Sequence, residues 1–168
     1  MLTAEARMRS HAAEVVEALT RRGETIAVAE SLTGGLLVAE LISVPGASLV
    51  VRGGVVAYAT ELKARLLGVD AGLLKRVGPV DAEVARQMAR GARERLGPDG
   101  APASFGLATT GVAGPDSQDG HPPGVAFVAL ASADGESILP VRLAGDREAI
   151  RRGVVSESLA LLIRALAE

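Results

Sequence analysis

TIAVAESLTGG, residues 25–35, ends an apolar run in a serine, a threonine and two glycines, and a second apolar run follows at residues 36–42. The first run predicts a short buried strand and the second predicts the body of a helix. Ser31 is therefore expected at a strand-to-helix corner, where unpartnered N–H groups and the positive end of the helix dipole suit an oxyanion or a phosphate. The simpler interpretation is that Ser31 or Thr33 caps the helix while the glycines permit the turn, and this stretch by itself favours it.

The segments outside this corner continue the alternation of strands and helices. The final strand pair is joined across Asp134-Gly135, which is typical of a hairpin, so the sheet must be mixed. We expect caps at Thr60, Asp81 and Asp146. Helices are predicted at residues 4–22, 60–67, 81–96 and from 146 onward, a single helical turn at 72–74, and strands at residues 53–58, 104–110, 125–131 and 138–143.

The composition limits the class of protein. With 168 residues, 48% of them hydrophobic, we expect one domain spanning residues 1–168. The net charge is -2, and the only aromatic residues are one tyrosine and two phenylalanines, so we expect no nucleic-acid partner. The absence of cysteine excludes disulfides and thiol catalysis. No apolar stretch approaches the roughly 18 residues of a membrane span, and no signal-peptide core is visible, so we expect no membrane contact and a cytoplasmic location.

Lysine is scarce, because arginine supplies every basic residue except Lys63 and Lys75. A chain that uses arginine so freely is expected to keep lysine where a group must accept a proton, since burial or a nearby cation can make lysine neutral and cannot do so for arginine. The alternative is two lysines left by chance on a solvated face. Tyr58, the sole tyrosine, lies five residues before Lys63, which makes Lys63 the more interesting of the two.

A loop rich in glycine, proline and acidic residues, GVAGPDSQDGHPPG at residues 111–124, follows the strand at 104–110. Loops of this length in a compact domain are more often functional than idle. Thr110, Gly111 and Gly114 are expected to present a hydroxyl and backbone N–H groups to an anionic or sugar-like ligand, and Arg147 is either a further ligand contact or a surface charge. The spacing matches no nucleotide-binding motif, and the loop's aspartates with one histidine do not predict a metal site.

A serine becomes a nucleophile only when a base takes its proton, and neither histidine has a suitable context. Lys63 is the remaining base for Ser31, and the Tyr58 hydroxyl would relay or donate a proton. Spacing alone does not establish that these three residues meet.

Several motifs occur in the order found in the CinA C-terminal family, the nicotinamide-nucleotide amidohydrolases, and the resemblance covers about residues 10–165. They are AESLTGG at 29–35, GGVVAYATELKARLLGV at 53–69, TGVAGPD at 110–116, PPG at 122–124 and GDREAIRR at 145–152. The resemblance implies a three-layer α/β/α sandwich, and with the hairpin we expect a mixed, mainly parallel sheet containing one antiparallel pair.

The same resemblance implies hydrolysis of the carboxamide of nicotinamide mononucleotide, a reaction of pyridine nucleotide salvage, without a metal or organic cofactor. It assigns the nucleophile to Ser31, with Lys63 and Tyr58 as its partners. Backbone N–H groups around three residues would then stabilise the oxyanion or hold the phosphate, namely Thr33, Gly34 and Gly35. We also expect a homo-oligomer that pairs through the weakly charged residues 36–58.

Three departures from the family's pattern leave alternatives open. Asp81 stands where serine is common, HPPG at 121–124 replaces Lys-Pro-Val-Gly, and Gly153 interrupts the last helix. The first two bear on substrate contacts, above all on phosphate affinity. The alternatives are a nucleotide-binding or assembly module that has lost turnover, and an amidohydrolase for another small substrate.

Overall fold

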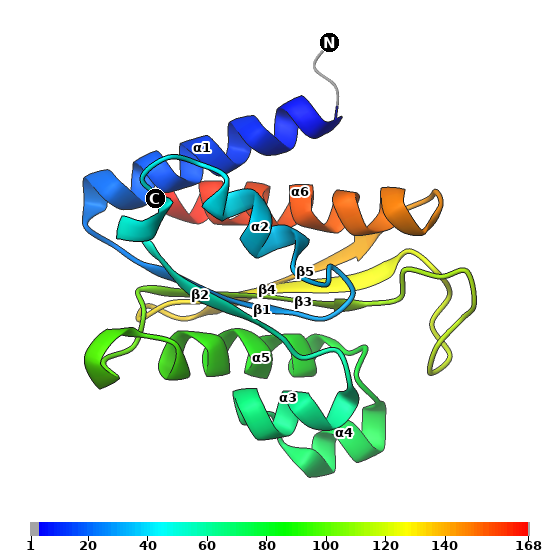
Figure 1. Cartoon of the computed structure of the whole chain (residues 1–168). Helices are drawn as coiled ribbons and strands as arrows, with labels where there is room; N and C mark the ends of the chain where they lie inside the picture. Colours follow the sequence, from blue (N-terminus) through cyan, green and yellow to red (C-terminus); the bar gives the residue numbers. More distant parts are fainter. Residues whose placement is uncertain (1–3, 168) are drawn as a thin grey trace.

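A five-stranded sheet in the order β2-β1-β3-β4-β5 forms the centre of the structure, a computed structural model that describes residues 4–167 (Figure 1). Strand β1 pairs in parallel with both β2 and β3, whereas β4 pairs antiparallel with β3 and with β5. The strands are β1 (Ile26–Glu30), β2 (Val51–Val56), β3 (Phe105–Gly111), β4 (Val125–Ala131) and β5 (Glu136–Arg142). The expected mixed sheet and its hairpin are confirmed, although parallel and antiparallel ladders are equally represented.

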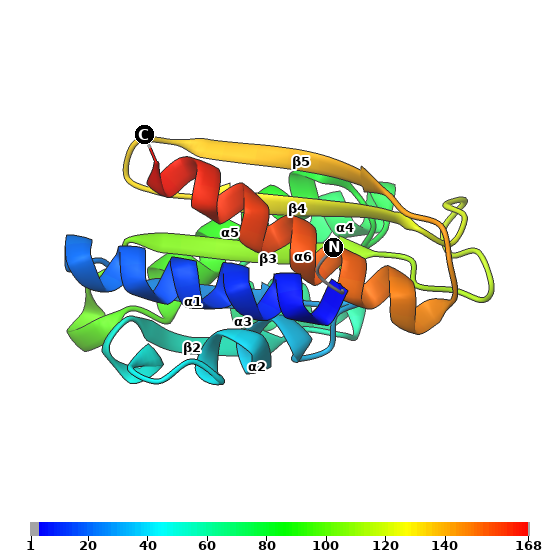
Figure 2. The same cartoon turned by 90° about the horizontal axis from the view of Figure 1, so that it is seen from above.

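Helices cover both faces of this sheet, which confirms the three-layer α/β/α architecture (Figures 1 and 2). We call α1, α2 and α6 the α1 layer, and α3, α4 and α5 the α5 layer. The helices are α1 (Ala4–Arg22), α2 (Leu36–Ile42), α3 (Thr60–Leu67), α4 (Ala71–Val77), α5 (Ala82–Arg95) and α6 (Arg147–Leu166), with short 3-10 turns η1 (Ala47–Leu49) and η2 (Pro98–Gly100).

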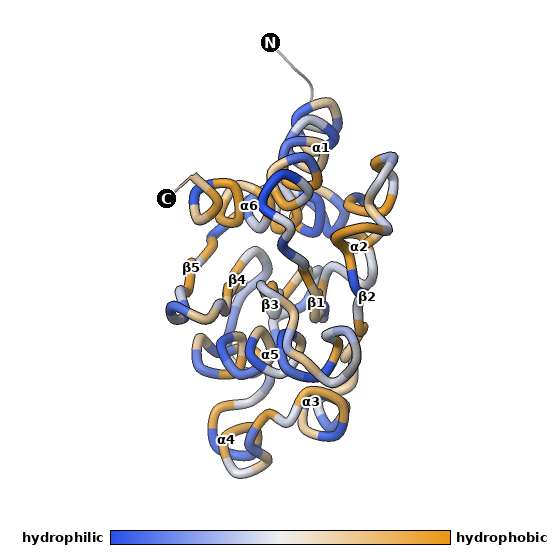
Figure 3. Tube along the Cα trace, turned by 90° about the vertical axis from the view of Figure 1, so that its left-hand side faces the viewer, coloured by the Kyte–Doolittle hydropathy of each residue, from blue (hydrophilic) through white to orange (hydrophobic). Residues whose placement is uncertain are grey.

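Two hydrophobic cores lie between the layers, and Figure 3 shows apolar positions of the helices turned toward the sheet. The core under the α1 layer contains large aliphatic side chains such as Leu19 and Leu159. The core under the α5 layer is rich in alanine, because α5 approaches β3 closely. A Cβ added at Gly106 would lie 2.0 Å from the Ala89 carbonyl oxygen, so only glycine fits that position.

Two of the three expected caps are present. The Asp81 carboxylate accepts a hydrogen bond from the Glu83 N–H at 2.8 Å, and that of Asp146 accepts from the Ala149 N–H at 2.8 Å. The prediction for Thr60 is wrong, because Thr60 is the first residue of α3 and the cap position is held by Ala59, which makes no side-chain bond.

The segment at 72–74 is longer than the single turn we expected. It belongs to α4, which Asp70 caps by accepting from the Leu73 N–H. At the unexpected Gly153 an added Cβ would come 2.6 Å from Leu143 Cδ1, so a larger residue there would require that leucine side chain to shift.

Within residues 4–167, no helix is both long and apolar enough to cross a membrane. The same described residues contain no cluster of three or more His, Cys, Asp or Glu side chains arranged to hold a metal ion.

Candidate active site

The carboxyl ends of β1 and β3 open into a cavity of about 130 Å³ that contains Ser31. Such an edge is where α/β sheets usually bind their ligands. At this volume the cavity is smaller than the roughly 300 Å³ of an ordinary ligand pocket, so it suits the reacting end of a substrate rather than a whole nucleotide. Its walls are formed by Ser31, Leu32, Tyr58, Pro79, Val80, Thr110, Gly111, Val112, Ala113, Gly114, Asp116, Gln118 and Arg147.

Ser31 and Lys63 meet at this edge although they come from different elements. Lys63 projects from α3, and its Nζ donates to Ser31 Oγ at 3.1 Å and to the Ala57 carbonyl oxygen at 2.7 Å. Lys63 is completely buried and Ser31 is 7% exposed. The other lysine, Lys75, lies exposed at the surface, so only one of the two scarce lysines occupies a special environment.

Burial lowers the pKa of Lys63 from 10.5 to about 8, because a charged ammonium is poorly solvated there, and the nearby Glu61 carboxylate opposes this only in part. A pKa near 8 leaves a useful fraction of neutral amine at neutral pH. A neutral amine has two N–H groups and one lone pair, and the Ala57 carbonyl accepts one of these N–H groups.

Glu30, directly before the serine, caps α2. Its carboxylate is completely buried and accepts from the N–H groups of Gly35 at 3.0 Å, Leu37 at 3.1 Å and Val38 at 2.9 Å. These are amides that a helix N-terminus leaves unpartnered, and a carboxylate also complements the helix dipole. The expectation that Ser31 or Thr33 caps this helix is therefore wrong, since neither makes a side-chain bond to it.

The free amides of the corner differ from those we expected. The Gly34 N–H donates to the Ser31 carbonyl at 3.1 Å and the Gly35 N–H to Glu30, so both have partners within the chain. The hydroxyl of Thr33 is hydrogen bonded to that of Thr109 at 2.8 Å. Among the described residues, the N–H groups of Leu32 and Thr33 have no acceptor. Of the three positions we expected, only Thr33 keeps an available amide, and Leu32 joins it.

Tyr58 lies at the mouth of the cavity rather than beside the amine. It is 60% exposed, and its hydroxyl accepts from Arg147 Nη2 at 3.2 Å. Within the described residues no hydrogen bond connects Tyr58 to Ser31 or Lys63. Arg147 also donates to the Gly114 carbonyl at 2.6 Å. The side chains of Tyr58 and Arg147 therefore form the rim of the cavity together.

The glycine-rich loop forms another part of the wall, and Thr110, Gly111 and Gly114 all line the cavity. Thr110 Oγ1 donates to the Pro79 carbonyl at 2.6 Å. Its hydroxyl can therefore accept a hydrogen bond from a ligand but cannot donate one. Asp116 and Gln118 also line the wall. The sequence argument considered the loop's aspartates only as metal ligands or as local hydrogen-bonding residues of a turn, and so missed the place of Asp116 in the cavity.

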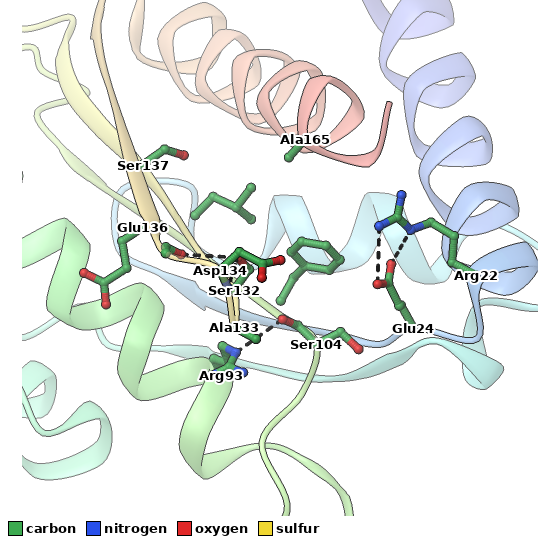
Figure 4. Close-up of a pocket in the computed structure, with 13 residues that line it drawn as sticks. Arg22, Glu24, Arg93, Ser104, Ser132, Ala133, Asp134, Glu136, Ser137 and Ala165 are labelled. Atoms are coloured by element: carbon green, nitrogen blue, oxygen red, sulfur yellow. Dashed lines mark hydrogen bonds and ion pairs between the residues drawn. The ribbon is translucent and has the colours of Figure 1, made fainter. Parts of the chain in front are cut away.

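A larger cavity of about 730 Å³ lies at the other end of the sheet, where β1 and β3 begin (Figure 4). Its basic groups are already paired: Arg22 forms an ion pair with Glu24 at 2.6 Å, and Arg93 donates to the Ser104 carbonyl at 3.2 Å. Size alone would favour this cavity, but the Ser31 and Lys63 pair lies in the smaller one, which we therefore take as the candidate active site.

Several known proteins are similar to this chain over most of its length. The chain is 52% identical over 153 residues to the CinA-like protein of Frankia casuarinae and 45% identical over 153 residues to that of Geobacter sulfurreducens. These matches cover 91% and 90% of this chain but only 34% and 36% of the relatives, so the chain spans about a third of their length.

Solved structures of similar size share the whole fold. The competence/damage inducible protein CihA of Agrobacterium tumefaciens is 32% identical with a TM-score of 0.90, and each chain is fully covered. A CinA superfamily protein of Klebsiella pneumoniae is 30% identical with a TM-score of 0.89, over 95% of this chain and 98% of that one. The family model described as the CinA C-terminal domain matches residues 8–166, and the chain therefore belongs to the CinA C-terminal domain family.

Proposed function

We propose that this protein hydrolyses the carboxamide of nicotinamide mononucleotide to nicotinic acid mononucleotide and ammonia through an acyl-enzyme on Ser31. The observation that carries the proposal is the 3.1 Å contact between Lys63 Nζ and Ser31 Oγ in a buried setting where the pKa of Lys63 falls to about 8. A nucleophile within hydrogen-bonding reach of a base with that pKa is the arrangement that acyl transfer requires.

In the first step, Ser31 Oγ attacks the carboxamide carbon and its proton passes to the neutral amine of Lys63. The carbonyl oxygen becomes an oxyanion, to which the free N–H of Leu32, a residue that lines the cavity, would donate, together with the free N–H of Thr33. The resulting Lys63 ammonium then protonates the departing nitrogen. Ammonia leaves and the acyl group remains as an ester on Ser31.

In the second step, water attacks the ester carbon while Lys63 takes a proton from the water. The acyl–oxygen bond breaks, the proton returns to Ser31 Oγ, and the carboxylate product leaves with both side chains in their starting forms. The cycle balances as substrate plus water giving acid plus ammonia.

The rim of the cavity would hold the rest of the substrate. Arg147 is the one cationic residue among the described residues that line the cavity and suits the phosphate, and Tyr58 keeps the guanidinium in place through its hydroxyl. We propose that Tyr58 orients the substrate and Arg147, because its hydroxyl is bonded to Arg147 and makes no bond to the amine among the described residues. Asp116 and Gln118, which also line the cavity, would supply acceptors for the sugar hydroxyls.

The deciding experiment is to incubate the purified protein with nicotinamide mononucleotide and to measure ammonia. We expect Ser31→Ala to reduce kcat by at least about 1,000-fold. Equal rates for the wild type and Ser31→Ala would contradict the proposal. Tight binding of the mononucleotide without ammonia release would instead support the binding-module alternative, and release of ammonia or acid only from other amides or esters would redirect the substrate assignment.

A further inference from the structure

The turn that carries Ser31 is hydrogen bonded to Arg151, a side chain of α6. Arg151 Nε donates to the Leu32 carbonyl at 3.0 Å and Nη2 donates to the Thr33 carbonyl at 3.0 Å. Its remaining terminal nitrogen contacts Glu148 at 3.1 Å. The guanidinium fork therefore bridges two successive carbonyl groups of the corner, which is a geometry that arginine supplies and lysine does not.

These two hydrogen bonds of Arg151 set the directions of the neighbouring backbone N–H groups. A trans peptide is planar, so its C=O and N–H groups point in opposite directions. When Arg151 holds the Leu32 carbonyl, the Thr33 N–H must point away from α6. When Arg151 holds the Thr33 carbonyl, the Gly34 N–H points the other way and donates to the Ser31 carbonyl at 3.1 Å. The Ser31 carbonyl and the Leu32 N–H belong to one peptide plane, so this bond also sets the direction of the Leu32 N–H.

Leu32 and Thr33 are also the two places where the corner leaves amides unused. From residue 31 to residue 38, the other N–H groups all donate to Thr109, Ser31, Thr33 or Glu30. The residues with free amides are 4% and 0% exposed, and a buried N–H without an acceptor is unfavourable unless a ligand completes it. Leu32 lines the cavity together with Ser31.

We infer that Arg151 is the positioning residue that aims the oxyanion-stabilising amides of Leu32 and Thr33. The inference rests on the proposed amide hydrolysis, because the amides matter to the reaction only if an oxyanion forms at Ser31. Arg151 itself does not line the cavity and acts through the backbone. The close fit extends to Gly34, where an added Cβ would lie 3.3 Å from Arg151 Nη2 at a φ of +60°.

The first test compares Arg151→Ala with Arg152→Ala, which removes the same charge one residue further along α6. Arg152 pairs only with Glu148 and Glu5 and touches no part of the corner in the described structure. We expect Arg151→Ala to lower kcat by about 10- to 100-fold with KM within about threefold, because misaimed donors weaken transition-state stabilisation more than ground-state binding. Arg152→Ala should keep the wild-type kcat.

The pH profile separates this role from damage to the base. The rise of kcat through about pH 8 should persist in Arg151→Ala, because burial of Lys63 is unchanged. Arg151→Lys keeps the charge and guards against simple misfolding, and it should recover less than half of the lost activity since one ammonium cannot span both carbonyls. Equal kcat for Arg151→Ala and Arg152→Ala would overturn the inference, as would full recovery by lysine.

A second measurement does not depend on turnover. Hydrogen exchange at the Gly34 amide, resolved by NMR, should quicken in Arg151→Ala and stay at the wild-type rate in Arg152→Ala, because the bond to the Ser31 carbonyl depends on the hydrogen bonds of Arg151. If the wild type shows no amidase activity but this exchange difference appears, the proposed function fails while the role of Arg151 in holding the corner stands. Unchanged exchange at Gly34 would remove the structural basis of the inference whatever the activity.

Discussion

The proposed chemistry of the site depends on one buried amine. Because the pKa of Lys63 is lowered to about 8 by burial, the neutral form that accepts a proton from Ser31 increases as the pH rises. We therefore expect kcat/KM to rise about tenfold per pH unit below pH 8 and to level off above it. Initial rates between pH 6 and 9.5 would check this, and a profile flat across that range would contradict a lysine base.

The lowered pKa also makes stability depend on pH. Lys63 has a pKa of about 8 when folded and 10.5 when unfolded, so the unfolded chain binds more protons between these values. The contribution of Lys63 to the free energy of unfolding therefore rises from pH 8 to 10.5, by at most about 3 kcal/mol. Urea unfolding of the wild type and of Lys63→Met across this range should show the rise in the wild type alone.

Arginine at position 63 distinguishes a base from a fixed positive charge. We expect Lys63→Arg to be nearly as inactive as Lys63→Ala, within about tenfold, because a guanidinium keeps its proton at any pH that the fold survives. Lys75→Arg is the matched control, because the Lys75 side chain is exposed at the surface, and it should behave as the wild type. Substantial turnover by Lys63→Arg would reduce the lysine to a positioning charge.

At the scale of elements, α2 depends on the residue that ends the strand before it. Replacing Glu30 by glutamine puts N–H donors where three backbone amides already point, so at least one buried amide loses its acceptor. We expect a loss of about 1 to 3 kcal/mol in the free energy of unfolding, measured by urea denaturation. Glu14→Gln on the exposed side of α1 is the control and should be neutral. A neutral Glu30→Gln would show that water or a rearranged turn replaces the cap.

Local pattern predicted most elements because each has its own periodicity and turn residues. The bounds of α2 and α3 and the caps Asp81 and Asp146 were all present in short windows of sequence. The cap of α2 was missed because Glu30 acts from the strand end and lies outside the usual cap position and residue types. The pairing of Ser31 with Lys63 was suggested by lysine scarcity, but their contact depends on tertiary packing across 32 positions.

The whole molecule exposes apolar side chains along one edge. Ile42 is 60% exposed, Leu49 is 64% exposed and Val56, on the edge strand β2, is 42% exposed. We propose that two copies pair through this surface, as expected for residues 36–58. Leu49→Lys should then shift the mass measured by light scattering toward the monomer, while Leu66→Lys, on α3 and 45% exposed in the wild type, should leave it unchanged. A monomeric wild type would contradict the proposal.

The two residues assigned to the proposed reaction, Ser31 and Lys63, are held by opposite layers of the molecule. The corner that bears Ser31 is fastened to α6 of the α1 layer through Arg151, whereas Lys63 belongs to α3 of the α5 layer, on the other face of the sheet. The distance between Lys63 Nζ and Ser31 Oγ therefore depends on the relative position of the two layers. A small displacement of α3 on warming would separate Lys63 from Ser31 while the secondary structure is still intact. We therefore expect the proposed activity to be lost, reversibly, at a lower temperature than the circular dichroism signal.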